Sequence, residues 1–133
     1  MTLNRTNSSL PTELELLIES TIGCCLNVHK ELGPGLNEGI YARACCIELR
    51  ATGLRFEREK AVVIRYRDKL LCHQRIDLLV EQKLIVEVKS VERLHPLHLA
   101  QTVGYLRVTG LRAGLLVNFN VPLLRDGIRR VVL

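Results

Sequence analysis

The sequence contains no tryptophan and few other aromatic residues. Phenylalanine, tyrosine and tryptophan together make up 4% of the 133 residues. Proteins that bind single-stranded nucleic acid without sequence preference commonly stack the bases on several aromatic side chains. The shortage of such side chains argues against this mode of binding. The remaining composition, with 47% hydrophobic and 25% charged residues, is ordinary for a globular protein.

Long hydrophobic runs are also lacking. No apolar stretch approaches the roughly 18 residues that a transmembrane helix requires, and the polar start MTLNRTNSSL has no apolar centre of the kind found in signal peptides. We therefore expect a soluble, cytoplasmic protein without a membrane partner. The polar start predicts a flexible tail at residues 1–10, and the length of the chain predicts one domain at residues 11–133.

The five cysteines form no recognised metal-binding or disulfide pattern. No CxxC pair occurs, and the total is odd: Cys24 and Cys25 are adjacent, Cys45 and Cys46 are adjacent, and Cys72 stands alone. This arrangement argues against a zinc ribbon and against a disulfide framework. Small buried thiols in a reducing compartment are the simplest interpretation.

Positive charge is concentrated in the second half of the chain. Residues 1–60 carry a net charge of −1 and residues 61–133 carry +6, which together give the overall +5. A basic half is compatible with a polyanionic partner such as nucleic acid. Many soluble domains are equally basic, so charge alone does not identify the partner.

Hydrophobic periodicity predicts a mixed α/β domain with the element order ααβββαβ. A first helix is expected from Pro11 to the GPG at 33–35, and a second from the cap Asn37 to about Arg50. The next segments are strand-like, with RDK and EQK as turns: FEREKAVVIRY, LLCHQRIDLLV and LIVEVKS. HPLHLAQTVGYLRVT predicts a third helix, AGLLVNFN a buried strand, and GIRRVVL an edge strand or tail. We expect a central sheet covered by helices.

Three charged residues interrupt the apolar strands of RIDLLVEQKLIVEVK. They are Asp77, Glu87 and Lys89. If EQK is a three-residue loop centred on Gln82, Asp77 lies opposite Glu87 with Cβ atoms about 4.5–5.5 Å apart. Alternation along the strand places Lys89 on the same face. The opposite face then receives the apolar residues Leu78, Val80, Leu84, Val86 and Val88.

Two facing carboxylates repel each other unless something neutralises them. Mg²⁺ and Mn²⁺ prefer oxygen ligands of this kind, and a nearby lysine can hold a phosphate oxygen or lower the pKa of a water. Two simpler interpretations exist: Lys89 bridges the acids, or all three charges lie exposed at a sheet edge. The apolar surroundings weaken these simpler interpretations, because isolated buried charges are unfavourable.

Two other stretches carry polar residues at helical spacing. In GLNEGIY, Glu38 and Tyr41 lie three apart at a helix start and share a face. In HLAQTVGY, Gln101 and Tyr105 lie four apart, with His98 one turn earlier. Glu38 could instead complement the helix dipole, and the second set could be a polar stripe on a half-buried helix.

Together these stretches resemble one known family. GLNEGIY is similar to the signature of the GxxExxY family, a group of small bacterial and archaeal proteins placed in the PD-(D/E)XK nuclease superfamily. RIDLLVEQKLIVEVKS, LHLAQTVGYLRVTGLRAGLLVNF and GIRRVV resemble the remainder of that family, over about residues 12–132. The combination of GxxExxY with Asp-x₉-Glu-x-Lys and Gln-x₃-Tyr, in this order, makes the resemblance specific.

The resemblance implies a restriction-endonuclease-like core with a Mg²⁺- or Mn²⁺-dependent phosphodiesterase centre. Ile76 stands where the name of the motif has proline, a replacement that is common across the superfamily. The implied residues are, as metal ligands, Asp77, Glu87, Glu38 and Val88 through its carbonyl oxygen; for catalysis, Lys89, Glu87, Asp77 and Gln101; and as supporting residues, Tyr41 and Tyr105.

Two functional hypotheses follow. The first is a metal-dependent nuclease acting on DNA, in which basic residues guide the nucleic-acid backbone: Arg75, Arg93, Arg107 and Arg112. The second is a nucleic-acid-binding or regulatory module that retains the acids without significant turnover. So small a domain has little surface for sequence recognition. Both hypotheses are therefore compatible with a homodimer or with a protein partner that enlarges the binding surface.

A third hypothesis concerns the histidines. A transition-metal site could use His73, His95 and His98. The proline between His95 and His98 marks a helix start, however, and solvated or packed histidines are the simpler interpretation.

Overall fold

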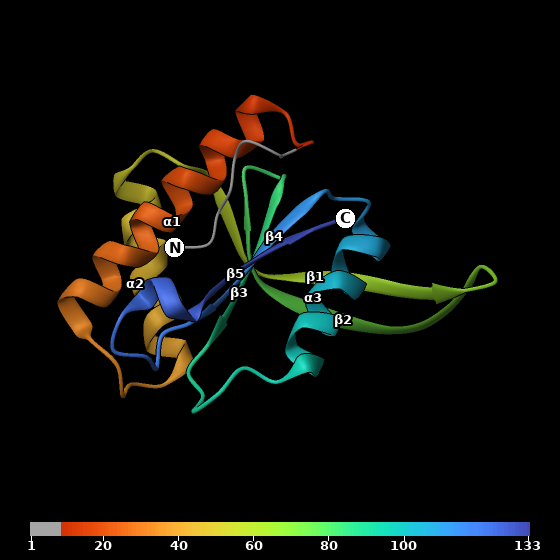
Figure 1. Cartoon of the computed structure of the whole chain (residues 1–133). Helices are drawn as coiled ribbons and strands as arrows, with labels where there is room; N and C mark the ends of the chain where they lie inside the picture. Colours follow the sequence, from red (N-terminus) through yellow and green to blue (C-terminus); the bar gives the residue numbers. More distant parts are fainter. Residues whose placement is uncertain (1–8) are drawn as a thin grey trace.

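A computed structural model describes residues 9–133 as a five-stranded sheet with three α-helices (Figure 1). The first half contains α1 (Thr12–Leu32), α2 (Glu38–Ala51), β1 (Phe56–Tyr66) and β2 (Lys69–Val80). The second half contains β3 (Leu84–Lys89), α3 (Pro96–Thr109), β4 (Ala113–Asn118), a 3-10 helix η1 (Leu124–Gly127) and β5 (Ile128–Val132). The predicted order ααβββαβ is confirmed, with GIRRVVL forming an edge strand.

Most of the expected N-terminal tail, residues 1–8, lies outside the described residues. Leu10 is buried and packs into the core beside α1. None of the helices in residues 9–133 has the length and apolar character needed to cross a membrane.

The strands lie side by side in chain order, β1-β2-β3-β4-β5. All neighbouring pairs are antiparallel except β3 and β4, which are parallel and joined through α3. Helices α1 and α2 cover one face of the sheet and α3 covers the other (Figure 1). The result is a three-layer arrangement in which both faces of the central strands are buried.

The predicted register of the β2–β3 hairpin is confirmed. Val80 pairs with Leu84 and Leu78 with Val86, and these residues pack with Val88 in the core beneath α1 and α2. The loop closes without glycine because Glu81 and Gln82 adopt left-handed conformations, with φ of 52° and 59°. The apolar face was therefore assigned correctly from alternation alone.

β1 and β2 continue beyond the rest of the sheet as a two-stranded arm, residues 61–75 (Figure 1). Its paired residues run from Ala61 and Arg75 to Tyr66 and Lys69. The three-residue RDK turn expected at the tip is wrong, because Lys69 already pairs with Tyr66. The turn consists of Arg67 (φ 49°) and Asp68 (φ 64°) alone, the left-handed pair typical of a two-residue hairpin loop.

The expectation of buried thiols holds for four of the five cysteines. Cys24, Cys25, Cys45 and Cys46 are buried on α1 and α2, whereas Cys72 is exposed on the arm. All five are free thiols. Burial raises the pKa of Cys24 and Cys46, so these thiols remain protonated at neutral pH and pack as small hydrophobic groups.

Candidate active site

Asp77 and Glu87 lie where β2 begins to diverge from β3. The described β2–β3 pairing ends at Leu78 and Val86, one residue short of the two acids. Oδ2 of the half-buried Asp77 accepts a hydrogen bond of 2.7 Å from the backbone N–H of Val88. A side chain thus replaces the backbone in linking the strands, and Asp77 is fixed beside Glu87.

Glu87 is a buried acid with an abnormal pKa. Only 3% of the residue is exposed. Burial, supported by the negative charge of Asp77 and a hydrogen bond with it, raises the pKa of Glu87 to about 9, although Lys89 opposes the change. Among the described residues, Oε1 of Glu87 has no hydrogen-bond partner. Glu87 is therefore protonated at neutral pH unless a cation balances its charge.

Glu38 reaches the same place from α2. A cavity of about 150 Å³ is lined by side chains of α2, β1 and β2 together with Val88 of β3: Glu38, Gly39, Ala42, Arg58, Glu59, Asp77 and Val88. The structure therefore brings three of the four predicted metal ligands to one cavity, while the fourth, Glu87, contacts Asp77. Arg58 and Glu59 were not anticipated, because nothing in the β1 sequence distinguishes them from other exposed strand residues.

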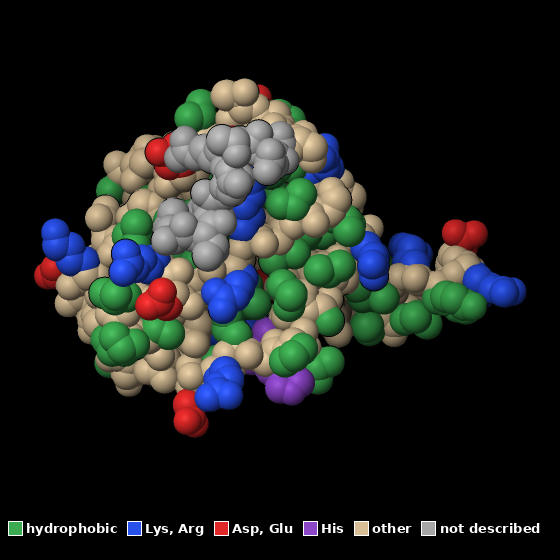
Figure 2. All heavy atoms as spheres, in the orientation of Figure 1, with side chains coloured by type: hydrophobic (Ala, Val, Ile, Leu, Met, Phe, Trp, Pro, Cys, Tyr) green, Lys and Arg blue, Asp and Glu red, His purple; other side chains and the backbone are tan. Residues whose placement is uncertain are grey.

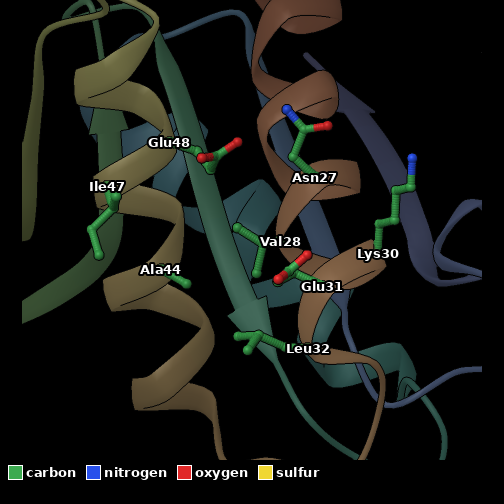
Figure 3. Close-up of a pocket in the computed structure, with 8 residues that line it drawn as sticks. All are labelled: Asn27, Val28, Lys30, Glu31, Leu32, Ala44, Ile47 and Glu48. Carbon is green, nitrogen blue, oxygen red and sulfur yellow. The ribbon is translucent and has the colours of Figure 1, made fainter.

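A larger groove lies between α1 and α2, away from these acids. Its volume is about 450 Å³, and both helices line it (Figure 3). Glu31 and Glu48 are among its side chains, but none of the predicted site residues is. Cavity size therefore does not locate the acidic site in this protein.

Tyr41 fixes the loop that precedes α2. Its buried hydroxyl donates a hydrogen bond to the carbonyl oxygen of Gly33 and accepts one of 3.1 Å from the N–H of Leu36. The ring stacks on Phe119 with centroids 4.5 Å apart. Asn37 then caps the helix by accepting a hydrogen bond from the N–H of Ile40. Tyr41 therefore holds the residues that place Glu38.

We expect Tyr41→Phe to lower the free energy of unfolding by about 1 kcal/mol, because the loop loses two partly buried hydrogen bonds, to the Gly33 carbonyl and from the Leu36 N–H. The ring and its stacking on Phe119 are retained. Urea denaturation followed by circular dichroism measures the change. Tyr66→Phe, at a side chain that is 62% exposed, is the matched control. Equal stabilities for the two variants would contradict this role.

The chain after Lys89 is held from two sides. The N–H of Ser90 donates a hydrogen bond of 3.4 Å to Oε1 of Glu38, and the Ser90 hydroxyl donates to the carbonyl oxygen of Leu36. These bonds connect the end of β3 to the start of α2. The position of Glu38 is thus coupled to the strand that carries Glu87 and Lys89.

Asn118 holds the other side of this segment, a role that the sequence analysis missed. It lies opposite Lys89 on the parallel strand β4 and is 2% exposed. Its amide accepts a hydrogen bond from the N–H of Val91 and donates one to the Val91 carbonyl, both at 3.0 Å. Gly127 packs against it so closely that a Cβ there would lie 2.1 Å from the Asn118 carbonyl oxygen. The sequence does contain a signal for this role, because Asn118 is a polar residue inside the apolar run AGLLVNFN.

The two predicted residues of α3 behave differently. Tyr105 is buried, and its hydroxyl donates a 3.0 Å hydrogen bond to Oε1 of Gln74. Burial and the negative charges of Glu87 and Asp77 raise the pKa of Tyr105. Gln101 is exposed one turn earlier, and no hydrogen bond within residues 9–133 joins it to the acids or to Lys89.

The three-histidine hypothesis is wrong. Nδ1 of His95 accepts a hydrogen bond from the N–H of Leu97, and Nδ1 of His98 accepts one from the N–H of His95. Both side chains cap the start of α3. In the part of the chain that the structure describes, no three His, Cys, Asp or Glu side chains are gathered to hold a metal ion. This also means that Glu38, Asp77 and Glu87 do not form a closed three-carboxylate cluster.

The donor set nevertheless suits a hard divalent cation. Mg²⁺ usually keeps several water ligands and is bound through one or two carboxylates, so a third carboxylate is not required. Asp77 and Glu87 supply two adjacent carboxylates, and the unpartnered oxygen of Glu87 is available to a ligand. A cation would also offset the burial and the negative charge of Asp77, which raise the pKa of Glu87.

The basic residues proposed as backbone guides come from different parts of the fold: β2, α3 and the segments on either side of α3. Arg75 forms an ion pair of 3.5 Å with Glu59, and Arg112 donates to the carbonyl oxygen of Leu133. Arg93 and Arg107 are exposed. Their role in guiding a nucleic-acid backbone stays a prediction.

Comparison with known proteins agrees with this geometry. The family model described as the PD-(D/E)XK nuclease superfamily matches residues 15–131. No curated protein and no solved structure matches the chain. The matched range includes nearly all of α1, every later helix and strand up to β5, and each residue of the acidic site. Together with the mixed sheet and its flanking helices, which are consistent with a restriction-endonuclease-like core, the match shows that the chain belongs to the PD-(D/E)XK nuclease superfamily.

Proposed function

We propose that this protein is a metal-dependent phosphodiesterase that cleaves DNA, with a site of the GxxExxY type. The observation that carries the proposal is the buried pair of Asp77 and Glu87, with an unpartnered Glu87 oxygen and Lys89 two residues further along β3. Membership in a nuclease superfamily supports the reaction class. Mg²⁺ or Mn²⁺ is the proposed cofactor, because both prefer oxygen ligands.

In this proposal the acids hold the metal and Lys89 acts on the reacting groups. Asp77 and Glu87 would be the principal ligands, with Glu38 and the Val88 carbonyl oxygen contributing from the cavity wall. A bound divalent cation lowers the pKa of a water ligand and stabilises negative charge on phosphate oxygens. The Lys89 ammonium group orients the attacking water or offsets the charge that develops on the phosphate. Tyr105 braces the acids from α3.

The role of Gln101 differs from that of the buried residues. Because it is exposed on α3, it can contact a phosphate or a water only from the solvent side. We propose that Gln101 meets the nucleic acid after binding and has no part in organising the metal site beforehand.

A cleavage assay with plasmid and linear DNA tests the proposal. We expect nicking or cutting in Mg²⁺ or Mn²⁺ that stops in EDTA, and a loss of about 10²-fold or more in Lys89→Ala. Lys83→Ala, in the β2–β3 turn and paired with Glu13, is the control and keeps full activity. Cleavage that survives Lys89→Ala or Glu87→Ala belongs to a contaminant and contradicts the proposal. Parallel reactions with RNA test the choice of DNA.

The second candidate function is a nucleic-acid-binding or regulatory module without turnover. It is favoured by the exposed position of Glu38 and by the lack of a closed three-ligand cluster within residues 9–133. Binding of DNA that is unaffected by metal, together with no cleavage under any metal condition, would support this function instead.

We also propose that the protein works in the cytoplasm. The five free thiols support a reducing compartment. Fractionation of cells that express the tagged protein tests this location; recovery with an extracytoplasmic fraction would contradict it.

A further inference from the structure

The β1–β2 arm has no role in the chemistry proposed above. It extends from the body as a two-stranded ribbon (Figures 1 and 2). β3 pairs with β2 only at residues 78–80, so residues 61–75 have no third strand beside them in the described structure. The base of the arm is covered by α3, where Val62 is buried and Gln74 bonds to Tyr105, so among the described residues only the outer part of the arm lacks a packing partner. An isolated two-stranded hairpin is only marginally stable in water. A long arm of this kind therefore contributes little to the stability of the domain. Contact with a binding partner explains its length better.

The arm exposes both hydrophobic and cationic side chains. Figure 2 shows hydrophobic groups along the arm together with Lys and Arg side chains. The exposed hydrophobic residues are Val63 (39%), Tyr66 (62%), Leu70 (53%) and Leu71 (62%). The outer cations are Arg65, Arg67 and Lys69, accompanied by the single acid Asp68.

Charge on the arm is balanced at its base but not at its tip. At the base, Lys60 pairs with Glu57 and Arg75 with Glu59. Among the described residues, none of the three outer cations takes part in an ion pair, and the Arg67 guanidinium lies over the Tyr66 ring at 5.6 Å. The tip is thus a positively charged surface mixed with apolar groups.

We propose that the arm inserts into a groove of duplex DNA and provides most of the affinity of the protein for its substrate. This inference rests on the proposed function, whose substrate it narrows to the double-stranded form. The major groove admits a two-stranded ribbon, and proteins that deform DNA combine cations with apolar side chains inserted between base steps. The unbalanced cations of the tip match the phosphates that border such a groove.

A second copy of the chain fits the arm less well. The outer edge of β1 is interrupted near its base by Glu59, which has a left-handed φ of 53° and lies between the charged residues Arg58 and Lys60. Charged and irregular residues at a sheet edge oppose strand pairing between molecules.

The arm sets the length of duplex that the protein can contact. β2 runs without a break from the arm into the acidic site, and eight residues separate Lys69 from Asp77. At about 3.3 Å per residue this distance is about 26 Å, or about eight base pairs at 3.4 Å each. DNA held by the tip therefore extends about eight base pairs from the phosphate at the acids.

Measurement of DNA binding in EDTA tests the role of the arm, because removal of the metal prevents cleavage of the DNA. Fluorescence anisotropy of the full chain with a 30-base-pair duplex, from 50 to 200 mM salt, gives both the affinity and its salt dependence. We expect the triple variant Arg65→Ala/Arg67→Ala/Lys69→Ala to bind about tenfold or more weakly, with the slope of log K against log salt reduced by about 2.7 for three lost phosphate contacts. The control Lys30→Ala/Arg43→Ala/Arg125→Ala removes the same charge from exposed positions outside the arm and changes neither quantity.

A second variant examines the apolar contacts. Leu70→Ser/Leu71→Ser should weaken duplex binding while the salt slope stays unchanged, because apolar contacts release no counterions. With Mg²⁺ or Mn²⁺ present, the wild-type protein should cleave poorly when fewer than about eight base pairs remain on the arm side of the cut.

The outcomes separate this inference from the proposed function. Wild-type affinity in the triple arm variant overturns the inference, and metal-dependent cleavage can still stand. Arm-dependent duplex binding without any cleavage supports the inference and contradicts the proposed nuclease activity. If sedimentation shows that the leucine variant converts a dimer into a monomer without loss of duplex affinity, the arm is a protein interface and the inference is wrong.

Discussion

Asp77→Asn should reduce the rate of metal-dependent DNA cleavage by about 10³-fold or more. Loss of a metal ligand removes several kcal/mol of transition-state stabilisation, and each 1.36 kcal/mol is a factor of ten in rate. Asparagine retains the shape of the side chain and one oxygen, which can still accept the hydrogen bond from the N–H of Val88. The variant therefore keeps the link between β2 and β3 and loses only the negative charge.

Single-turnover cleavage at increasing Mg²⁺ or Mn²⁺ measures this effect. Asp126→Asn, the same change at an exposed position in η1, is the control and cleaves at the wild-type rate. Thermal unfolding of both variants in EDTA verifies that Asp77→Asn is folded and that its loss of cleavage is not caused by a loss of stability. Equal cleavage rates for the two variants would show that Asp77 is not a metal ligand.

Glu87→Gln should stabilise the metal-free protein at neutral pH. The pKa of Glu87 is about 9 in the folded state and about 4.3 in an unfolded chain. Between these values the folded state binds one proton more than the unfolded state, so stability is greatest below about pH 4.3 and is lost as the pH rises toward 9. The loss is at most about 1.4 kcal/mol per pH unit. From pH 5 to 7 the wild type loses up to about 3 kcal/mol, a loss that glutamine, which does not ionise, avoids.

Urea unfolding in EDTA at pH 5 and pH 7 measures the difference between the two proteins. Addition of Mg²⁺ or Mn²⁺ at pH 7 should restore stability to the wild type, because a ligand that binds the folded state stabilises it, and should have no such effect on Glu87→Gln. Glu31→Gln, at an exposed position of α1, should follow the wild-type pH dependence. Parallel pH profiles for wild type and Glu87→Gln would show that Glu87 ionises normally.

The sequence predicts the elements of this fold well because their signals are local. Asn37 caps α2 as expected, and the loop centred on Gln82 gives the observed pairing of Leu78 with Val86. The same register places Asp77 beside Glu87. Both inferences need only the alternation of side chains along a strand and the geometry of one turn.

The remaining site geometry depends on packing between distant elements. Helical spacing shows that Gln101 and Tyr105 share one side of α3, but it does not show which of them turns toward the sheet. The structure buries Tyr105 and exposes Gln101. The supporting contacts of Asn118 with Val91 likewise join segments 27 residues apart, a separation at which no periodic pattern is informative.

The arm could have been recognised from strand length. β1 and β2 contain 11 and 12 residues, whereas β3 and β4 contain 6 each. Strands twice as long as their neighbours must extend beyond the sheet. The alternation in FEREKAVVIRY predicts a strand correctly, but it does not show where the neighbouring strand ends.

The agreement between strand order and chain order has a consequence for how the protein is made. A hairpin forms within about 1–10 μs, whereas the ribosome adds about 5–20 residues per second. The segment from Asp77 to Lys89 is one hairpin, and β1, β2 and β3 are neighbours in both sequence and sheet. The two acids can therefore meet through contacts that are local in sequence, whereas the pairing of β3 with β4 requires α3 to have been made first.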